Sequence, residues 1–293
     1  MFNKQFKKES IAEYKTALTE YEGTQKQIMN YSERLYNQRL SFKKTIENTL
    51  DLLNKIRNKP FEMETEVNEI QIEYKKFENT VLTIEKEVNI ALKKNALGAG
   101  AGVAAGAGIA TLGPSAAMAI ATTFGTASTG TAISALSGAA ATNAALAWLG
   151  GGAIAAGGAG GGMAAGSSFL ALAGPVGWAI GGGAIATAGI LTNSKNKKAA
   201  NEALEKAAEI RSGTRVLEGT KEEIIETNKL TYNTQRLLQS LHESSYKGVK
   251  EYDYDFPKIA ASDNKKLIRN LGTLVNNMKS AAQLLNRTIG DKA

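Results

Sequence analysis

Two glycine-rich stretches are the most direct candidates for ligand chemistry in the chain. Gly100–Ala105 and Gly160–Ala165 formally match the fingerprint of dinucleotide-binding proteins. In that fingerprint the glycines follow a strand, and an acidic residue about twenty positions further on binds the ribose. Neither stretch follows a predicted strand, and neither has an acidic residue near that distance. No lysine follows a Gly-rich loop in the P-loop pattern either, so the sequence predicts no nucleotide cofactor.

His242 is the single histidine, and the chain contains no cysteine. A multi-histidine metal site, a thiolate zinc site, a cysteine nucleophile and a disulfide are therefore excluded. A lone histidine on a charged helix gives no basis for a His-based catalytic triad, and we expect His242 to lie at the surface. The sequence thus predicts a protein that is not an enzyme and needs no cofactor or metal. The absence of cysteine leaves the redox compartment open.

The larger organisation follows from where the charges lie. Residues 1–94 contain 17 Lys/Arg and 15 Asp/Glu, residues 195–293 contain 18 and 13, and residues 95–194 contain none. Of the 30 glycines, 24 lie between Gly98 and Gly189. We therefore predict an N-terminal coiled-coil arm (1–94), a Gly/Ala-rich uncharged membrane segment (95–194) and a C-terminal helical arm (195–293).

Apolar residues in the N-terminal arm recur at alternating spacings of four and three, which is typical of a coiled-coil helix. One such seam runs from Ile11 to Ile56, interrupted by Gln25, Ser32 and Arg39. Pro60 should end or kink this helix because proline lacks the amide donor. A second seam then contains only apolar residues, and we expect its helix to continue past Lys94: Met63, Val67, Ile70, Tyr74, Phe77, Val81, Ile84, Val88 and Ala91.

The C-terminal arm is also predicted to be helical. After Asn193 and Ser194, apolar residues keep an approximate but drifting period at Ile210, Leu217, Ile224, Leu230, Leu237 and Leu241. The acidic and aromatic residues Glu251–Phe256 indicate a loop or a short docking strip. The last helix has a regular seam and a predicted cap at Ser262–Asp263: Leu267, Leu271, Leu274, Met278, Ala281 and Leu285.

The uncharged segment is long enough for several membrane spans of about 20 residues each. The best candidates are Ala96–Leu112, Thr131–Leu149 and Phe169–Leu191. Lysines flank the segment on both sides, and the positive-inside tendency then places both ends on one face of a bilayer, which implies an even number of spans. These flanking residues are the predicted interfacial anchors Lys93, Lys94, Lys195, Lys197 and Lys198.

Glycines within this segment recur every four residues, the small-xxx-small pattern that lets helices approach closely in lipid. The predicted helix-packing residues are Gly98, Gly102, Gly106, Gly158, Gly162, Gly166, Gly177 and Gly181. Trp148 and Trp178 lie beside Gly or Pro breaks, where either an interfacial anchor or a core residue would fit. Gly and Ala favour insertion only weakly, so arms that shelter the segment in a soluble form and release it later would suit this composition.

The arrangement of two charged arms around an apolar centre resembles the helical pore-forming toxins of the cytolysin A and haemolysin BL type. The central sequence Gly125–Asn143, continuing through Trp148 to Gly152, resembles a segment of poorly characterised Gly/Ala-rich bacterial membrane proteins. The first resemblance implies an all-α fold, an elongated antiparallel helical bundle or coiled coil with a central membrane-competent helical segment. The neutral region is larger and richer in glycine than the hairpin of those toxins.

From these patterns we expect a membrane-inserting helical protein that oligomerises and perturbs or permeabilises a bilayer, as a toxin or as an effector in its own cell. The alternative is a non-enzymatic coiled-coil scaffold, soluble or membrane-anchored. Expected partners are a lipid bilayer and either further copies of the chain or a helical partner protein. Nucleic acid is not expected, because acidic and basic residues are interspersed on the arms. No Sec-type signal peptide is visible, so we expect a membrane location with a soluble cytoplasmic or secreted form.

Overall fold

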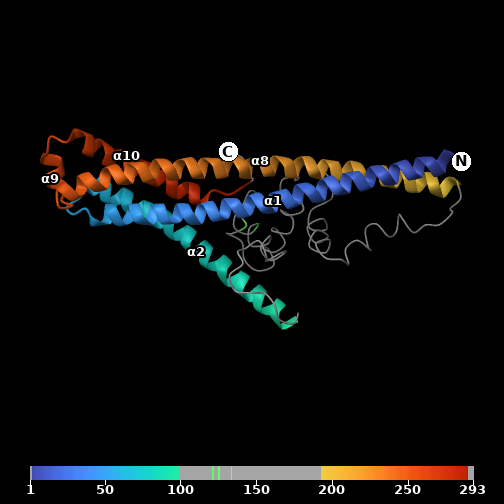
Figure 1. Ribbon diagram of the computed structural model, residues 1–293, viewed down its shortest axis with the longest axis horizontal. Coiled ribbons are helices and arrows are strands. Elements are labelled where there is room, and N and C mark those ends of the chain that lie inside the picture. Colours follow the sequence, from blue (N-terminus) through green and yellow to red (C-terminus); the bar gives the residue numbers. More distant parts are fainter. Residues whose placement is uncertain (1, 99–120, 122–124, 126–132, 134–192, 290–293) are drawn as a thin grey trace. The chain divides into compact units, whose positions relative to one another are not determined.

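The computed structural model describes residues 2–98, 121, 125, 133 and 193–289. Within these residues the fold is all-α, as predicted, and contains five helices and no strand (Figure 1). The helices are α1 (Phe2–Lys55), α2 (Phe61–Gly98), α8 (Asn193–Glu251), α9 (Phe256–Ala261) and α10 (Lys265–Asn286). They divide between two compact units, the first formed by Met1–Glu33, Glu87–Ile224 and Thr288–Ala293 and the second by Arg34–Lys86 and Ile225–Arg287.

The predicted seam of α1 is buried from Ile28 to Ile56. Two of its polar interruptions, Ser32 and Arg39, are buried together with the apolar residues, at 2% and 1% exposure. The helix ends at Lys55, five residues before Pro60, and α2 begins directly after that proline. A helix can start there because the first amides of a helix need no intrahelical partner.

The helix α2 continues past Lys94 to Gly98, as expected. Its seam is buried at Val67, Ile70, Tyr74, Phe77 and Val81. The helix α10 likewise buries every residue of its predicted seam. Its cap, however, is Asn264 rather than Ser262 or Asp263, because the Asn264 side chain accepts a hydrogen bond from the Leu267 amide at 3.0 Å. Ser262 instead follows the last residue of α9 as its C-cap.

The apolar seam predicted for α8 is wrong in the second unit. Leu230 and Leu237 are 45% and 50% exposed. The buried positions of this half of the helix are largely polar: Thr227, Thr231, Gln235, Leu238, Ser245 and Val249. These buried residues recur every three or four positions, in a pattern that starts at Ala203. Leu230 and Leu237 lie next to this buried stripe and not in it. The heptad-like spacing therefore determines the buried face, although polar side chains occupy many of its positions.

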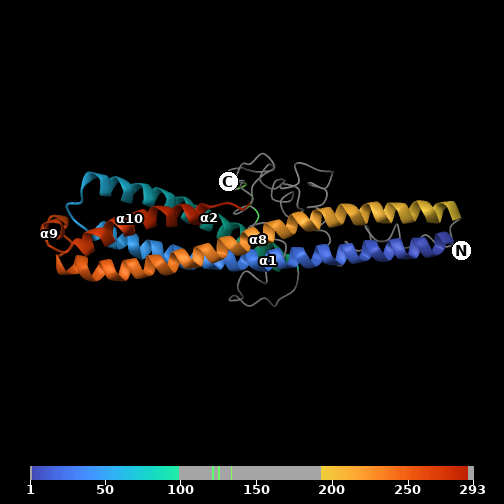
Figure 2. The same ribbon diagram turned by 90° about the horizontal axis from the view of Figure 1, so that it is seen from above.

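In the second unit the helices form two hairpins that pack side by side. A short turn joins α1 to α2, and α9 lies between α8 and α10 (Figures 1 and 2). Hydrogen bonds between α1 and α8 join residues 190 to 197 positions apart, from Gln38–Gln235 to Thr49–His242. Because the difference in residue number between bonded partners is nearly constant, the two helices run parallel. An antiparallel arrangement therefore does not describe this pair.

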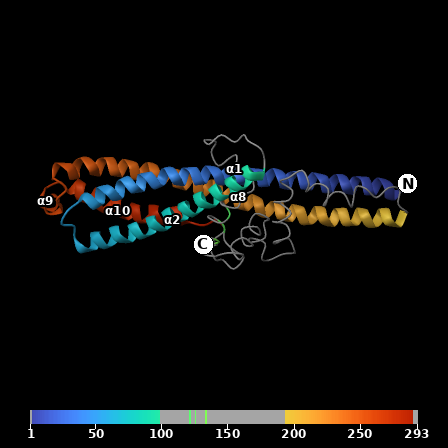
Figure 3. The same ribbon diagram turned by 90° about the horizontal axis from the view of Figure 1, so that it is seen from below.

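The other helix pairs of the second unit complete the bundle. The helices α2 and α10 lie next to each other and run parallel, since Lys279 contacts Glu69 and Asn286 contacts Glu73 (Figures 2 and 3). The helices α8 and α10 run in opposite directions and approach closely at Gly248. A Cβ atom at that position would lie 2.6 Å from a methyl group of Leu267, so a larger residue would force the buried Leu267 side chain to shift.

The loop after α8 docks on the turn between α1 and α2. Tyr252–Asp255 form turns and a bridge rather than helix, which confirms the predicted loop. The Arg57 amide donates to the Tyr254 oxygen at 2.7 Å, and the Phe256 amide donates to the Arg57 oxygen at 3.0 Å. Asn58 adds a side-chain hydrogen bond to Asp255 at 2.8 Å. This end of the second unit is thus fixed by reciprocal backbone hydrogen bonds.

In the first unit, the first halves of α1 and α8 form a close pair with small buried residues. Ala17, Ala200, Ala203 and Ala207 are all fully or almost fully buried. A Cβ atom at Gly213 would lie 3.2 Å from the ring of Tyr21, so the missing side chain lets the helices approach. Arg211 also pairs with Glu13 at 2.6 Å. These small contacts bury little apolar surface per residue, which limits their contribution to stability.

Candidate functional site

Most residues of the predicted membrane site lie outside the described residues. These are Trp148, Trp178 and every predicted packing glycine except Gly98, which is the last residue of α2. Lys93 and Lys94 lie near the end of α2, and Lys195, Lys197 and Lys198 lie near the start of α8. Lys197 and Lys198 are exposed, and Lys198 lies 4.0 Å from Glu202. No helix of the described part combines the length and apolar character needed to cross a bilayer.

Three described residues of the uncharged segment are buried. Ala121 and Ile133 have no exposed surface, and the Gly125 amide donates to the Ala121 oxygen at 2.8 Å. The Ile133 amide donates to the Gly125 oxygen at 2.9 Å. Gly125 also forms an isolated parallel bridge with Ile289, which is itself fully buried. The chain after α10 therefore contacts the uncharged segment within the first unit.

The second unit contains a polar cluster between α1 and α8, centred on Gln235. This side chain is 8% exposed. Its Nε2 atom donates to Ser41 Oγ at 3.0 Å and to Thr45 Oγ1 at 3.1 Å, and its Oε1 atom accepts from Gln38 Nε2 at 2.6 Å. Buried amides require such partners, because an unsatisfied one loses the hydrogen bonds that it makes with water. The observed rotation and register of the two helices satisfy these groups together.

His242 extends this cluster further along α8. Its Nδ1 atom lies 3.3 Å from Thr49 Oγ1, and the Thr49 hydroxyl donates its hydrogen to the backbone carbonyl oxygen of Thr45 at 2.8 Å. Because that hydrogen is already used, the imidazole must donate from Nδ1 to Thr49. The ring stacks on Tyr246 with 6.1 Å between centroids. Partial burial lowers the pKa of His242, while nearby Glu243 raises it by a smaller amount.

Arg39 is a second polar group in the core of this unit. Its Nη2 atom donates to the backbone oxygen of Arg287 at 2.7 Å, directly after the last turn of α10. A cation is stabilised at a helix C-terminus, where the last carbonyl groups carry partial negative charge. Burial and, to a smaller extent, the positive charge of Arg287 lower the pKa of Arg39 to about 9, so the side chain remains charged at neutral pH.

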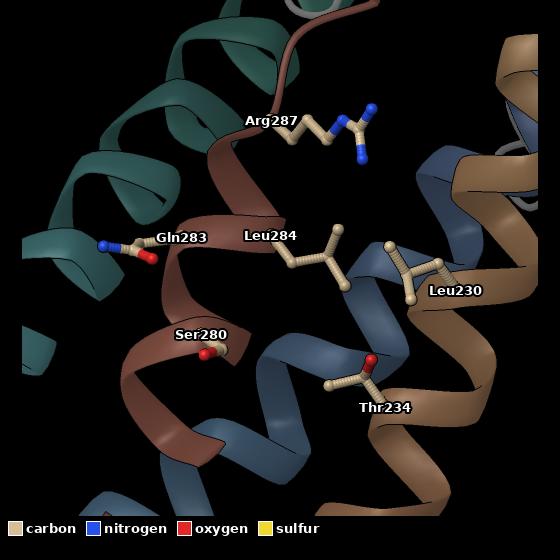
Figure 4. Close-up of a pocket in the computed structure, with 6 residues that line it drawn as sticks. All are labelled: Leu230, Thr234, Ser280, Gln283, Leu284 and Arg287. Carbon is tan, nitrogen blue, oxygen red and sulfur yellow. The ribbon is translucent and has the colours of Figure 1, made fainter. Parts of the chain in front are cut away.

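A groove of about 380 Å³ lies beside this arginine pair, between α8 and α10. Figure 4 shows Leu230 and Leu284 facing each other across it, with the Arg287 side chain extending from the end of α10 toward α8. The Thr234 and Ser280 hydroxyl groups lie further along. The lining contains no carboxylate: Leu230, Thr234, Ser280, Gln283, Leu284 and Arg287. These residues come from two distant segments, so no local sequence pattern could indicate them.

The described residues contain no group of His, Asp and Glu side chains that could hold a metal ion. Among the described residues, the fold forms the polar cluster and the groove between α8 and α10. In the polar cluster the Thr49 hydroxyl lies beside His242 but donates its hydrogen to the backbone oxygen of Thr45. The polar cluster could have been found by extending the spacing of three or four residues from Ala203 to Val249 without regard to polarity. No protein-family model, curated protein or solved structure matches the chain.

Proposed function

We propose that the protein is a membrane-inserting helical protein that oligomerises through its arms and perturbs or permeabilises a bilayer. The observation that carries this proposal is the uncharged segment 95–194 between two strongly charged helical arms. A long uncharged stretch can enter lipid, whereas each Lys, Arg or Asp at the centre of a span costs about 2.5 to 3.5 kcal/mol. In this proposal the segment forms an even number of glycine-packed spans, and the arms act as a coiled coil outside the bilayer.

The contacts of the first unit support a sheltered form of this segment. Ala121, Gly125 and Ile133 are held among other residues, with Gly125 bridged to Ile289. While the protein is in aqueous solution these apolar residues are buried inside it, and they become available to lipid only when such contacts break. In the proposed mechanism the sheltered form binds a membrane, releases the segment and then assembles.

A scaffold without membrane activity is the second candidate function. The observation in its favour is the pair Leu230 and Leu237, one heptad apart on the same side of α8, at 45% and 50% exposure. An amphipathic partner helix could cover such a face. In this case the uncharged segment would serve only as an anchor or a packed core.

Dye release from liposomes, followed by carbonate extraction of the vesicles, separates the two functions. A membrane-inserting protein releases dye and resists extraction, whereas a scaffold that merely binds vesicles causes no leakage. The substitution Ala140→Asp, at the centre of the candidate span Thr131–Leu149, should abolish leakage because it places a charge in the hydrocarbon. The matched control is Ala260→Asp on the exposed side of α9, which should leave leakage unchanged. Equal leakage by both variants would refute the proposed insertion.

A further inference from the structure

The chain directly after α10 packs against the uncharged segment within the first unit. The helix ends at Asn286, and the backbone is extended at Arg287. Ile289 then forms a parallel bridge with Gly125 and has no exposed surface, and Thr288 is 7% exposed. We call Thr288 and Ile289 the C-terminal latch.

Gly125, the partner of the C-terminal latch, connects the described residues of the uncharged segment. Its amide donates to the Ala121 oxygen at 2.8 Å, and its own oxygen accepts from the Ile133 amide at 2.9 Å. Ala121 and Ile133 are both 0% exposed. A glycine suits this position because another backbone can approach it closely. A single backbone position therefore links both of these buried residues to the C-terminal latch.

The residue before the C-terminal latch is held by the second unit. The chain passes from the second unit to the first between Arg287 and Thr288. The Arg287 oxygen accepts a hydrogen bond from the buried Arg39 side chain at 2.7 Å. Only Thr288 separates Arg287 from Ile289, and two residues of extended chain reach at most about 7 Å. The C-terminal latch therefore cannot follow the uncharged segment over a larger distance, and the bridge must break when that segment moves further.

The contacts of the C-terminal latch suit a reversible release. They include a bridge between two backbones and a buried isoleucine side chain. Backbone groups that lose a partner form hydrogen bonds with water instead, so the net contribution of the bridge is modest. Burial of one isoleucine shifts an equilibrium by about tenfold or more. Contacts of this size restrain the segment in water and can still break when lipid offers its apolar residues another environment.

We propose that the C-terminal latch is an autoinhibitory contact that holds the uncharged segment in its sheltered packing. In this proposal the bridge between Gly125 and Ile289 must break before the segment can enter a bilayer. The release step rests on the proposed membrane function, whereas the restraint on the segment does not. The restraint and the release therefore have separate measurements.

The restraint is tested by hydrogen exchange of the full-length protein, read by mass spectrometry in peptides that cover residues 121–133. Ile289→Ser should speed exchange in these peptides about tenfold or more, because a buried apolar side chain is lost and the segment opens more often. Peptides from α10 should keep their protection, which checks that the variant is folded. The control is Ile72→Ser, at an isoleucine that is 58% exposed, and it should leave these peptides unchanged. Unchanged exchange in Ile289→Ser, or equal effects of the two variants, would overturn the proposal.

A disulfide across the bridge tests the release. The chain has no cysteine, and paired backbones lie about 4.8 Å apart, which is within the range of Cα distances that a disulfide accepts. Gly125→Cys with Ile289→Cys should therefore cross-link under mild oxidation. The oxidised protein should release dye from liposomes at least tenfold more slowly than the same protein after reduction. In the control Gly125→Cys alone, at low protein concentration, reduction should leave the rate unchanged.

The two measurements distinguish a failure of the C-terminal latch from a failure of the membrane function. If Ile289→Ser speeds exchange while no form of the protein releases dye, the restraint stands and the proposed membrane function is wrong. If the cross-linked protein releases dye as fast as the reduced protein, the membrane function stands and the C-terminal latch does not control it.

Discussion

Arg39 Nη2 donates a hydrogen bond to the backbone oxygen of Arg287 over 2.7 Å, and this bond joins the core of α1 to the carboxyl-terminal end of α10. The guanidinium satisfies one of the carbonyl groups that a helix leaves without an intrahelical partner. It also fills a core position at which the coiled-coil pattern favours an apolar residue. The same side chain thus contributes both packing volume and a helix cap.

Replacing Arg39 separates these two contributions. Arg39→Ala should lower the free energy of unfolding by about 2 to 3 kcal/mol, because it leaves a cavity in the core. Arg39→Met should be more stable than Arg39→Ala, because it fills most of the volume without burying a charge. Urea denaturation followed by circular dichroism measures both. Both variants lack the hydrogen bond to Arg287, so a Met variant no more stable than the Ala variant would show that the volume of the side chain contributes little at this position.

The polar cluster predicts that the stability of the protein depends on the hydrogen bonds of Gln235. Gln235→Ala should destabilise the protein by about 1 to 3 kcal/mol, because Thr45 and its neighbours lose their hydrogen-bond partner inside the bundle. Gln235→Leu combined with Thr45→Val should recover most of this loss, since apolar side chains then replace both members of a buried pair. The measurement is again urea denaturation. The control is Asn233→Leu on the exposed side of α8, for which we expect little change.

How much of this fold the sequence predicts depends on whether apolar residues coincide with the heptad. They do in α1 from Ile28 onward, in α2 from Val67 to Val81 and in α10, and there the buried faces were predicted correctly. In the first part of α1 the buried residues are Ser10, Ala17 and Thr24 instead of the predicted seam. Apolar residues also do not coincide with the heptad in the second half of α8, where Thr231 and Gln235 occupy the buried positions and Leu230 and Leu237 lie outside. Hydrophobicity alone selects the wrong face, because hydrogen bonds to α1 compensate for the polar side chains.

Other features leave no local trace in the sequence. The parallel direction of α1 and α8 depends on the path of the chain through the uncharged segment, and helix periodicity carries no information on direction. The cap at Asn264 could not be separated from Ser262 and Asp263, since all three residue types are good caps. The groove brings Leu230 next to Leu284, and this pairing follows only from the packing of α8 against α10.

His242 makes the stability of the folded protein depend on pH. Its pKa is lowered below the ordinary value of 6.5, so the folded state holds fewer protons than the unfolded state below that pH. The stability that it contributes is therefore present above pH 6.5 and is lost as the pH falls toward the folded pKa. Thr49 faces the ring from α1, and Glu243 and Tyr246 face it from α8.

Thermal unfolding at pH 7.5 and at pH 5.5 tests this dependence. The wild-type protein should lose more stability on acidification than His242→Gln, which retains a polar side chain but cannot be protonated in this range. The difference between the two proteins isolates the histidine from the carboxylates, which titrate in both. An identical loss in the two proteins would exclude His242 as the source.

Substitution of Gly248 tests whether α8 approaches α10 as closely as the structure shows. In a helix, Gly→Ala normally stabilises by up to about 1 kcal/mol. At Gly248 the added Cβ atom would meet the Leu267 side chain at 2.6 Å, so Gly248→Ala should instead destabilise by about 1 to 3 kcal/mol. Gly219, in the same helix, is the matched control, because a Cβ atom added there would meet no other atom within 4 Å and Ala should be stabilising. Stabilisation in both variants would show that α10 does not pack this closely.

The rotation of α8 against α1 can be tested by cross-linking, because the chain has no cysteine to interfere. Thr49 and His242 contact each other at 3.3 Å, so Thr49→Cys with His242→Cys should form an intrachain disulfide under mild oxidation. Thr49→Cys with Leu237→Cys is the control, because Leu237 lies on the exposed side of α8. Non-reducing gel electrophoresis at low protein concentration detects the product. Efficient cross-linking of the control pair would mean that α8 turns its leucines toward α1.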